Sequence, residues 1–179
     1  MPPARGGSMP ARRLTILTGA IDSGKTSWCL AFARSHPGAD GVLLKKVFRG
    51  GRRVGYDALR LATGRRAAFA RLAGAEPAGF QTVERVGAFN IGRAGRRAAN
   101  RWLLEALQSG AKVLIVDEIG PLELAGGGLA DSIPAVLASS SVRHLILVVR
   151  RGCLEQAIER FRLPEHRRLE LPGAVHRLI

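Results

Sequence analysis

Cysteine is scarce in this 179-residue sequence, and long apolar runs are missing. Cys29 and Cys153 stand far apart, with no CxxC pair and no histidine cluster beside them. Two such cysteines are too few for a disulfide scaffold and do not form a structural zinc motif. We expect two reduced thiols and a cytoplasmic protein.

The longest apolar runs, such as LILVV at 145–149, are far too short to cross a bilayer, so we expect no membrane segment. The N-terminal MPPARGGSMPARR carries basic residues but no long apolar region after them, so we do not expect it to be a secretory signal. We interpret residues 1–12 as a flexible basic tail and residues 13–179 as a single domain.

Acidic residues are also few, and the net charge is +14. Residues 43–101 alone hold fourteen Lys and Arg against three Asp and Glu, a net charge of +11. Such a segment attracts anions, namely nucleotides, nucleic acid or acidic lipid. The alternative is an arginine-rich surface with no specific partner, because 24 of the 28 basic residues are arginine.

The hydrophobic pattern alternates between strands and helices. We expect buried strands at 14–18, 112–117 and 144–149, a short strand over 85–91, helices over 25–36, 94–108 and 154–161, and a strand pair at 41–48 and 54–61 that turns at Gly50-Gly51. This order predicts an α/β fold of three layers, with a mostly parallel sheet and helices on both faces. The β-hairpin segment, about 41–72, is interpreted as an insertion into that core.

The stretch Gly19–Thr26, GAIDSGKT, matches G-x-x-x-x-G-K-[ST] between an expected strand and an expected helix. In such a loop the backbone N–H groups and the helix N-terminus bind phosphates. Lys25 is the residue that reaches the β- and γ-phosphates, and the Thr26 hydroxyl is a magnesium ligand. The predicted nucleotide-binding residues are Gly19, Ala20, Ile21, Asp22, Ser23, Gly24, Lys25, Thr26 and Ser27.

Asp22 places a negative charge where anionic phosphates should bind. Loops of this kind often need a left-handed backbone at that position, which Asp tolerates better than most residues. We therefore favour a role in backbone shape, with the carboxylate turned outward. The alternative is a carboxylate near the γ-phosphate that handles a second ligand or water.

A second motif, VLIVDEIGPLEL at 113–124, ends an apolar strand with two adjacent acids. Asp117 at the strand end is placed to hold the magnesium shell. Glu118 is placed to polarise a water for in-line attack on the γ-phosphate, as a catalytic residue beside Lys25.

DEIGPLEL resembles the DEIGPMEL signature of the cancer-related nucleoside-triphosphatases, a family with thermophile members. GGRRVGYDALRLATGRRAAFARL at 50–72 and VGAFNI at 86–91 are similar to further pieces of that family, in the same order, over about residues 13–171. The resemblance implies a P-loop NTPase fold, magnesium as cofactor, and slow hydrolysis with loose base preference. It gives phosphate binding to Gly19, Gly24, Lys25 and Thr26, magnesium to Asp117 and water activation to Glu118.

The chain departs from the family pattern at two places. Ile21-Asp22 replaces the usual Pro-Gly of the loop, and Arg150-Arg151 replaces a His-Arg pair after the strand at 144–149. Arg150, with Arg151 beside it, is our candidate for the arginine that neutralises transition-state charge; the alternative is that both are surface charges. Phe48, Tyr56 and Phe89 are candidate neighbours of the base, or else packing residues, and no N-K-x-D motif selects guanine.

We therefore predict magnesium-dependent hydrolysis of nucleoside 5'-triphosphates to diphosphate and phosphate. One alternative is a P-loop kinase for a small anionic metabolite or nucleotide. Another is a nucleotide-switched module that binds nucleic acid through residues 43–101, although that segment has little aromatic interleaving for base stacking. A further alternative is a GTP-binding accessory protein of the molybdopterin-guanine type. The DEIGPLEL motif favours a hydrolase over this alternative.

Overall fold

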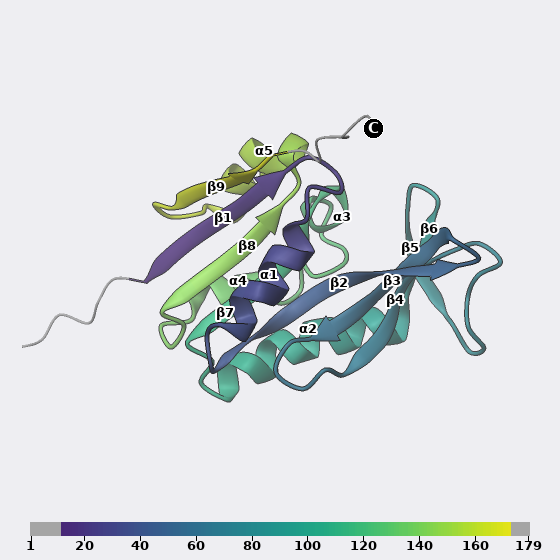
Figure 1. Cartoon of the computed structure of the whole chain (residues 1–179), viewed down its shortest axis with the longest axis horizontal. Helices are drawn as coiled ribbons and strands as arrows, with labels where there is room; N and C mark the ends of the chain where they lie inside the picture. The colour runs from purple at the N-terminus through teal and green to yellow at the C-terminus, as the bar shows by residue number, and fades with distance from the viewer. Residues whose placement is uncertain (1–11, 173–179) are drawn as a thin grey trace, which may run out of the picture.

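The computed structural model describes residues 12–172, and within them nine strands form one sheet (Figure 1). The strand order is β5-β6-β4-β3-β2-β7-β8-β1-β9. The strands are β1 (Arg13–Gly19), β2 (Ala39–Arg49), β3 (Arg52–Arg60), β4 (Arg66–Leu72), β5 (Thr82–Val86), β6 (Phe89–Gly92), β7 (Val113–Ile119), β8 (His144–Val149) and β9 (Arg167–Leu171). The helices are α1 (Lys25–Arg34), α2 (Arg93–Gln108), α3 (Pro121–Leu124), α4 (Ile133–Ala138) and α5 (Leu154–Phe161), with a 3-10 turn η1 (Arg151–Cys153).

The expectation of a mostly parallel sheet is confirmed only in part, because the sheet is mixed. Strands β2, β7, β8, β1 and β9 pair in parallel. The pairs β2–β3, β3–β4, β4–β6 and β5–β6 are antiparallel. The cause is β2, which pairs with β7 on one side and turns through Gly50-Gly51 into β3 on the other. The hairpin expected over 41–72 is thus part of the central sheet, which it continues.

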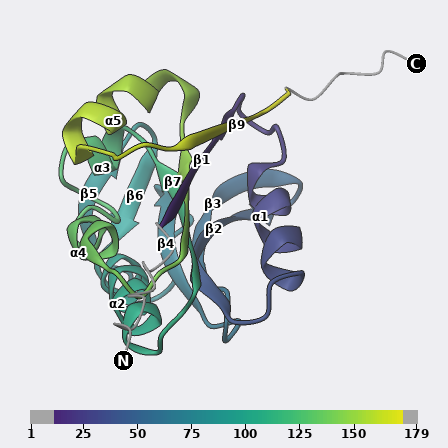
Figure 2. The same ribbon diagram turned by 90° about the vertical axis from the view of Figure 1, so that its left-hand side faces the viewer.

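Helices cover both faces of the sheet, as expected from its apolar strands (Figure 2). Helix α1 packs on one face, where Cys29 is buried together with Leu17, Leu43, Ile115 and Ile146. Helices α2, α4 and α5 lie on the other face, where Trp102 and Leu103 contribute to the larger core. Ile16 and Leu17, consecutive residues of β1, therefore enter the cores on opposite faces of the sheet. This explains why the sequence of β1 is apolar without interruption.

Two further expectations concern the short strand at 85–91 and the N-terminal tail. The expected short strand over 85–91 is two strands, β5 and β6, because Gly87 has a φ of 55° and turns the chain between them. The tail predicted over 1–12 lies outside the described residues except for Arg12, whose guanidinium donates to the Leu137 carbonyl over 2.6 Å. No helix in the described part of the chain is long and apolar enough to cross a membrane.

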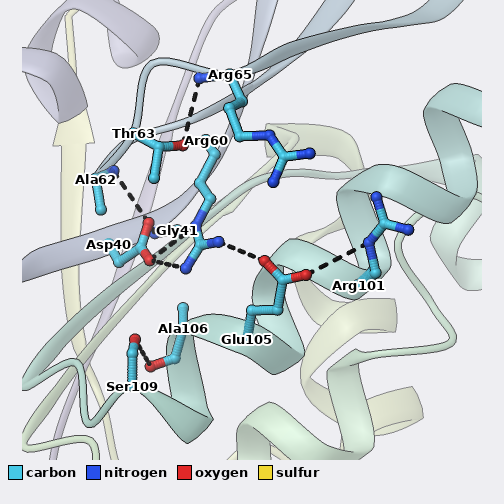
Figure 3. A network of polar contacts seen from close by, with 10 residues as sticks. All are labelled: Asp40, Gly41, Arg60, Ala62, Thr63, Arg65, Arg101, Glu105, Ala106 and Ser109. Atoms are coloured by element: carbon cyan, nitrogen blue, oxygen red, sulfur yellow. Dashed lines mark hydrogen bonds and ion pairs between the residues drawn. The ribbon is translucent and has the colours of Figure 1, made fainter.

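A buried ion-pair network joins the two halves of the sheet to α2 (Figure 3). Arg60 on β3 donates through Nε and Nη2 to the Asp40 carboxylate on β2, at 3.1 and 2.9 Å. Its Nη1 contacts Glu105 on α2. Asp40 also accepts from the backbone of Gly41 and Ala62. The charges of Asp40 and Arg60, both buried, are thus compensated by fixed partners.

Candidate functional site

The Gly19–Thr26 loop runs from the end of β1 into the first turn of α1. Gly19 has a φ of 150°, and a Cβ there would lie 2.7 Å from the Leu171 carbonyl oxygen of β9. Gly24 has a φ of 86°, a value that L side chains rarely adopt. Both glycines are therefore required by the turn, as the sequence motif predicts.

Asp22 has a φ of 63°, which confirms the expected left-handed backbone. Its carboxylate does not point at the loop interior but contacts the ammonium group of Lys46 on β2. This hydrogen bond to Lys46 lowers the pKa of Asp22. The negative charge in the loop is thus compensated by a lysine from another strand.

The Lys25 ammonium group lies inside the loop, where it donates to the Ala20 carbonyl over 2.7 Å and to the Gly19 carbonyl over 3.2 Å. It also reaches the Ser23 hydroxyl at 3.4 Å. The side chain of Ile21, by contrast, points away from the fold and is 81% exposed. Of the loop side chains, Lys25 is the one placed to meet an anion bound in the loop.

Thr26 on α1 and Asp117 at the end of β7 meet although they are 91 residues apart. The Thr26 hydroxyl donates to Asp117 Oδ2 over 3.2 Å, and the Leu44 N–H of β2 donates to the same oxygen over 3.2 Å. Burial, together with the neighbouring Glu118 charge, raises the pKa of Asp117 to about 7. A buried carboxylate with few neutralising partners is a favourable ligand for a divalent cation.

Magnesium prefers oxygen ligands and usually combines one or two protein groups with phosphate oxygens and water. The Thr26 hydroxyl and the Asp117 carboxylate fit that donor set. Within residues 12–172 no group of three or more His, Cys, Asp or Glu side chains could hold a metal by itself. A magnesium ion at this corner would therefore need phosphate oxygens to complete its shell.

Glu118 follows Asp117 and points to the end of the neighbouring strand β8. The register between β7 and β8 shifts between Val116 and Ile119, and such an irregularity re-aims side chains at a strand end. Arg150 Nε donates to Glu118 Oε1 over 2.5 Å. Burial alone would lower the pKa of Arg150, but the Glu118 carboxylate outweighs it and raises that pKa.

The structure separates the two arginines that the sequence analysis treated together. Arg150 lies beside Glu118, whereas Arg151 pairs with Glu170 on β9 at 3.0 Å. A Cβ added at Gly120, in the DEIGPLEL turn, would lie 3.0 Å from the Arg150 side chain. Of the two, Arg150 is therefore the one placed with the acid pair.

Glu123, the last acid of DEIGPLEL, was not predicted to have a role. Its buried carboxylate accepts from the Gly120 N–H over 3.0 Å and from the Leu129 N–H over 3.2 Å. Burial raises the pKa of Glu123 to about 7. The signal was present in the sequence, because a Glu three residues after a helix start commonly binds the N-terminal N–H groups.

Lys46 of β2 was missed as a neighbour of the loop, and Arg53 of β3 lies near it. Together with Asp22 they line a cavity of about 470 Å³ whose other walls are Phe48, Leu72, Ala88 and Phe89. No local pattern identifies these residues, because β2, β3 and β6 reach the loop only through the sheet.

The geometry of the loop and the acid pair indicates a class of protein. A glycine-dependent turn between a buried strand and a helix, with a carboxylate from a second strand against its Thr, is typical of nucleotide-binding α/β proteins. The family model for NTPases matches residues 14–171, nearly the whole described chain. The chain belongs to this NTPase family.

Named relatives agree with this assignment. The chain is 30% identical over 144 residues to the nucleoside-triphosphatase THEP1 of Pyrobaculum aerophilum, an alignment that covers 79% of this chain and 76% of the relative. The crystal structure of THEP1 from Aquifex aeolicus superposes with a TM-score of 0.68 at 23% identity and covers 93% of this chain and 94% of that one. The solution structure of a human cancer-related nucleoside triphosphatase gives a TM-score of 0.58 at 21% identity, covering 94% and 90%. The two structures share the fold of this chain, and the resemblance to nucleoside-triphosphatases noted from DEIGPLEL is confirmed.

Proposed function

We propose that this protein is a P-loop enzyme that hydrolyses nucleoside 5'-triphosphates to diphosphate and phosphate, with magnesium, slowly and with loose base preference. The observation that carries the proposal is the 3.2 Å contact between the Thr26 hydroxyl and Asp117 Oδ2. It joins the Gly19–Thr26 loop to the acid pair of β7. The strand order supports a P-loop fold, since β8 lies between β1, which leads into the loop, and β7, which ends in the acids.

Phosphate binding would fall to the loop backbone and Lys25. The first turn of α1 directs its free N–H groups and the positive end of its dipole toward the loop. The Lys25 ammonium now occupies the loop interior on the carbonyls of Gly19 and Ala20. An incoming triphosphate offers the same ammonium charged acceptors, which bind it more strongly than neutral carbonyls do.

Glu118 would orient and deprotonate the attacking water. Its carboxylate is one-quarter exposed, so water can reach it. Arg150 holds this carboxylate in place and brings a positive charge to the position where charge develops on the transferred phosphoryl group. Thr26 and Asp117 are the residues that would hold magnesium, which when bound neutralises negative charge on the β- and γ-phosphate oxygens.

The other functions proposed from the sequence are less well supported. In the basic segment 43–101, five of the fourteen basic residues have carboxylate partners: Lys46, Arg60, Arg71, Arg96 and Arg101. These pairs reduce the free charge that a nucleic acid would bind. A cytoplasmic location is proposed from Cys29 and Cys153, which are both buried and free.

The test is phosphate release from ATP, GTP, CTP and UTP, each with magnesium and with a chelator. We expect slow release from all four with magnesium and none with the chelator. Lys25→Ala should abolish nucleotide binding, which a fluorescent-nucleotide titration measures. Nucleotide binding without phosphate release under any of these conditions would exclude the hydrolase and favour the kinase or the nucleotide switch.

A further inference from the structure

The cavity beside Asp22 has features that nucleotide hydrolysis does not use. It measures about 470 Å³ and is lined by Asp22, Lys46, Phe48, Arg53, Leu72, Ala88 and Phe89. Its walls combine two cations with two phenylalanines, one of which, Phe48, is 60% exposed. Phe48 thus brings an exposed ring beside charged groups, a combination found in ligand sites.

The position of the cavity follows from β2. The Leu44 N–H donates to Asp117 Oδ2, the oxygen that also accepts from Thr26. Lys46 lies two residues further along the strand, about 7 Å away, and contacts Asp22 of the loop. The cavity therefore opens beside the corner formed by Thr26 and Asp117.

That corner marks the terminal-phosphate end of a bound triphosphate, if the proposed function is correct. Thr26 and Asp117 would hold a magnesium ion that neutralises charge on the terminal phosphates, so the ribose and base of the triphosphate would extend away from this corner. The base of the hydrolysed nucleotide is thus not the natural occupant of the cavity.

The cations and the aromatic rings indicate a ligand with two chemical parts. Arg53 lies over the rings of Tyr56 and Phe89, at 5.6 and 5.8 Å from their centroids. Within residues 12–172 the Arg53 guanidinium has no carboxylate at ion-pair distance, so its charge is available to an anion, and Arg binds phosphate well. Phe48 and Phe89 offer faces and edges on which a flat ring packs.

We propose that this cavity is a second ligand site, separate from the triphosphate site, which binds a small organic phosphate that carries a flat ring. Arg53 binds the phosphate group, beside the Lys46–Asp22 ion pair, and Phe48 and Phe89 contact the ring. The inference rests on the proposed function, because the orientation of the triphosphate separates the two sites.

The test uses AMP as the probe and isothermal titration calorimetry on protein saturated with magnesium and a non-hydrolysable ATP analogue. We expect AMP to bind this loaded protein with a stoichiometry near one. Adenosine, which lacks the phosphate, and ribose 5-phosphate, which lacks the ring, should each bind at least about tenfold more weakly, the loss of one charged or aromatic contact.

Variants locate the site. Arg53→Ala and Phe48→Ala should each weaken AMP binding by about tenfold or more and leave ATP hydrolysis at the parent rate. Arg52→Ala changes an exposed arginine next to Arg53 on β3 that is not among the residues lining the cavity. Arg97→Ala changes an arginine in a separate hollow of about 340 Å³ on α2, lined also by Arg93 and Arg101. Both control variants should bind AMP as the parent does.

Three results would overturn the second site. AMP that displaces the ATP analogue would show that it occupies the triphosphate site. An equal loss in Arg97→Ala and Arg53→Ala would show attraction to arginine charge in general, and no AMP binding would exclude the ligand class. Failure of the proposed function is seen separately, as absent phosphate release by the parent protein without AMP.

Discussion

Arg150 Nε donates to Glu118 Oε1 over 2.5 Å, and this contact joins the ends of two neighbouring parallel strands. Glu118 follows the acid that contacts Thr26, and Arg150 is the first residue after β8. The pair thus places a carboxylate and a guanidinium on the same edge of the sheet as the Gly19–Thr26 loop, the edge at which α/β sheets bind ligands.

Arg150→Ala should lower kcat for ATP hydrolysis by about 10²–10³-fold, because a positive charge aimed at the transition state is lost. Arg151→Ala is the matched control: its partner is Glu170 on β9, and it should keep nearly the parent rate. Steady-state phosphate release measures both variants. Equal losses in the two variants would show that Arg150 has no special role.

Glu118→Gln should reduce hydrolysis at least about 10²-fold, as expected when a general base is removed. The amide keeps the size of the side chain and an oxygen that accepts from Arg150. Nucleotide affinity should therefore stay within about twofold of the parent protein. A fluorescent-nucleotide titration beside the phosphate assay separates the two quantities, and a variant that hydrolyses ATP at the parent rate would exclude Glu118 as the base.

Asp22→Val should lower the free energy of unfolding by about 1–2 kcal/mol, because the left-handed φ of 63° is costly for a β-branched side chain. Asp22→Gly and Asp22→Asn tolerate this backbone and should stay close to the parent protein in chemical denaturation. Asp22→Asn also removes the charge that contacts Lys46. If it destabilised the protein as much as Asp22→Val, the charge rather than the backbone shape would be decisive.

The free energy of unfolding should fall as the pH rises from about 4.5 to about 7, the ordinary and folded pKa values of Glu123. The folded state binds the Glu123 proton more tightly than the unfolded state, so the stability that the neutral carboxyl contributes is complete below 4.5. It is lost as the pH rises through 7, by on the order of 3 kcal/mol.

Glu123→Gln should flatten that slope, whatever its effect on the overall stability. Urea denaturation at pH 5, 6, 7 and 8 measures the slope for the parent and the variant. Burial also raises the pKa of Asp117 to about 7. Asp117 therefore contributes to the pH dependence of stability in both proteins. An unchanged slope in Glu123→Gln would mean that Glu123 is ionised across this range.

Arg60→Ala should destabilise the fold by about 3–5 kcal/mol, because it leaves the buried Asp40 carboxylate without its cation. Arg101→Ala removes an arginine of the same network, paired with Glu105 at 3.4 Å, but its side chain is 61% exposed. The change should cost less than about 1 kcal/mol. Thermal and urea denaturation compare the stability of the two variants. Similar losses of stability would show that the burial of the Arg60–Asp40 pair does not determine its contribution.

Much of the site could be predicted because its parts are local in sequence. The spacing of Gly19, Gly24 and Lys25 prescribes a turn between a strand and a helix, and the φ values of the structure agree. The acids Asp117 and Glu118 end an apolar strand, where polar residues meet the edge of a parallel sheet. Glu123 was predictable in the same way but was overlooked.

The remaining site residues could not be predicted from local patterns. Lys46 reaches Asp22 only because β2 pairs with β7. Arg150 differs from Arg151 only by where β8 ends, since Arg150 meets Glu118 of β7 and Arg151 meets Glu170 of β9. The Thr26–Asp117 contact was implied by the motifs, but the second donor to Asp117, the Leu44 N–H, comes from another strand, β2.

The sequence by itself determined the α/β class, the loop and the acid pair, since each depends on backbone geometry and residue spacing within a dozen residues. The tertiary structure decided that the sheet is mixed, that Lys46 neutralises Asp22 and that Arg150 rather than Arg151 meets Glu118. These outcomes depend on strand order and register between segments far apart in the chain, which are fixed by burying two apolar cores on opposite faces of one sheet.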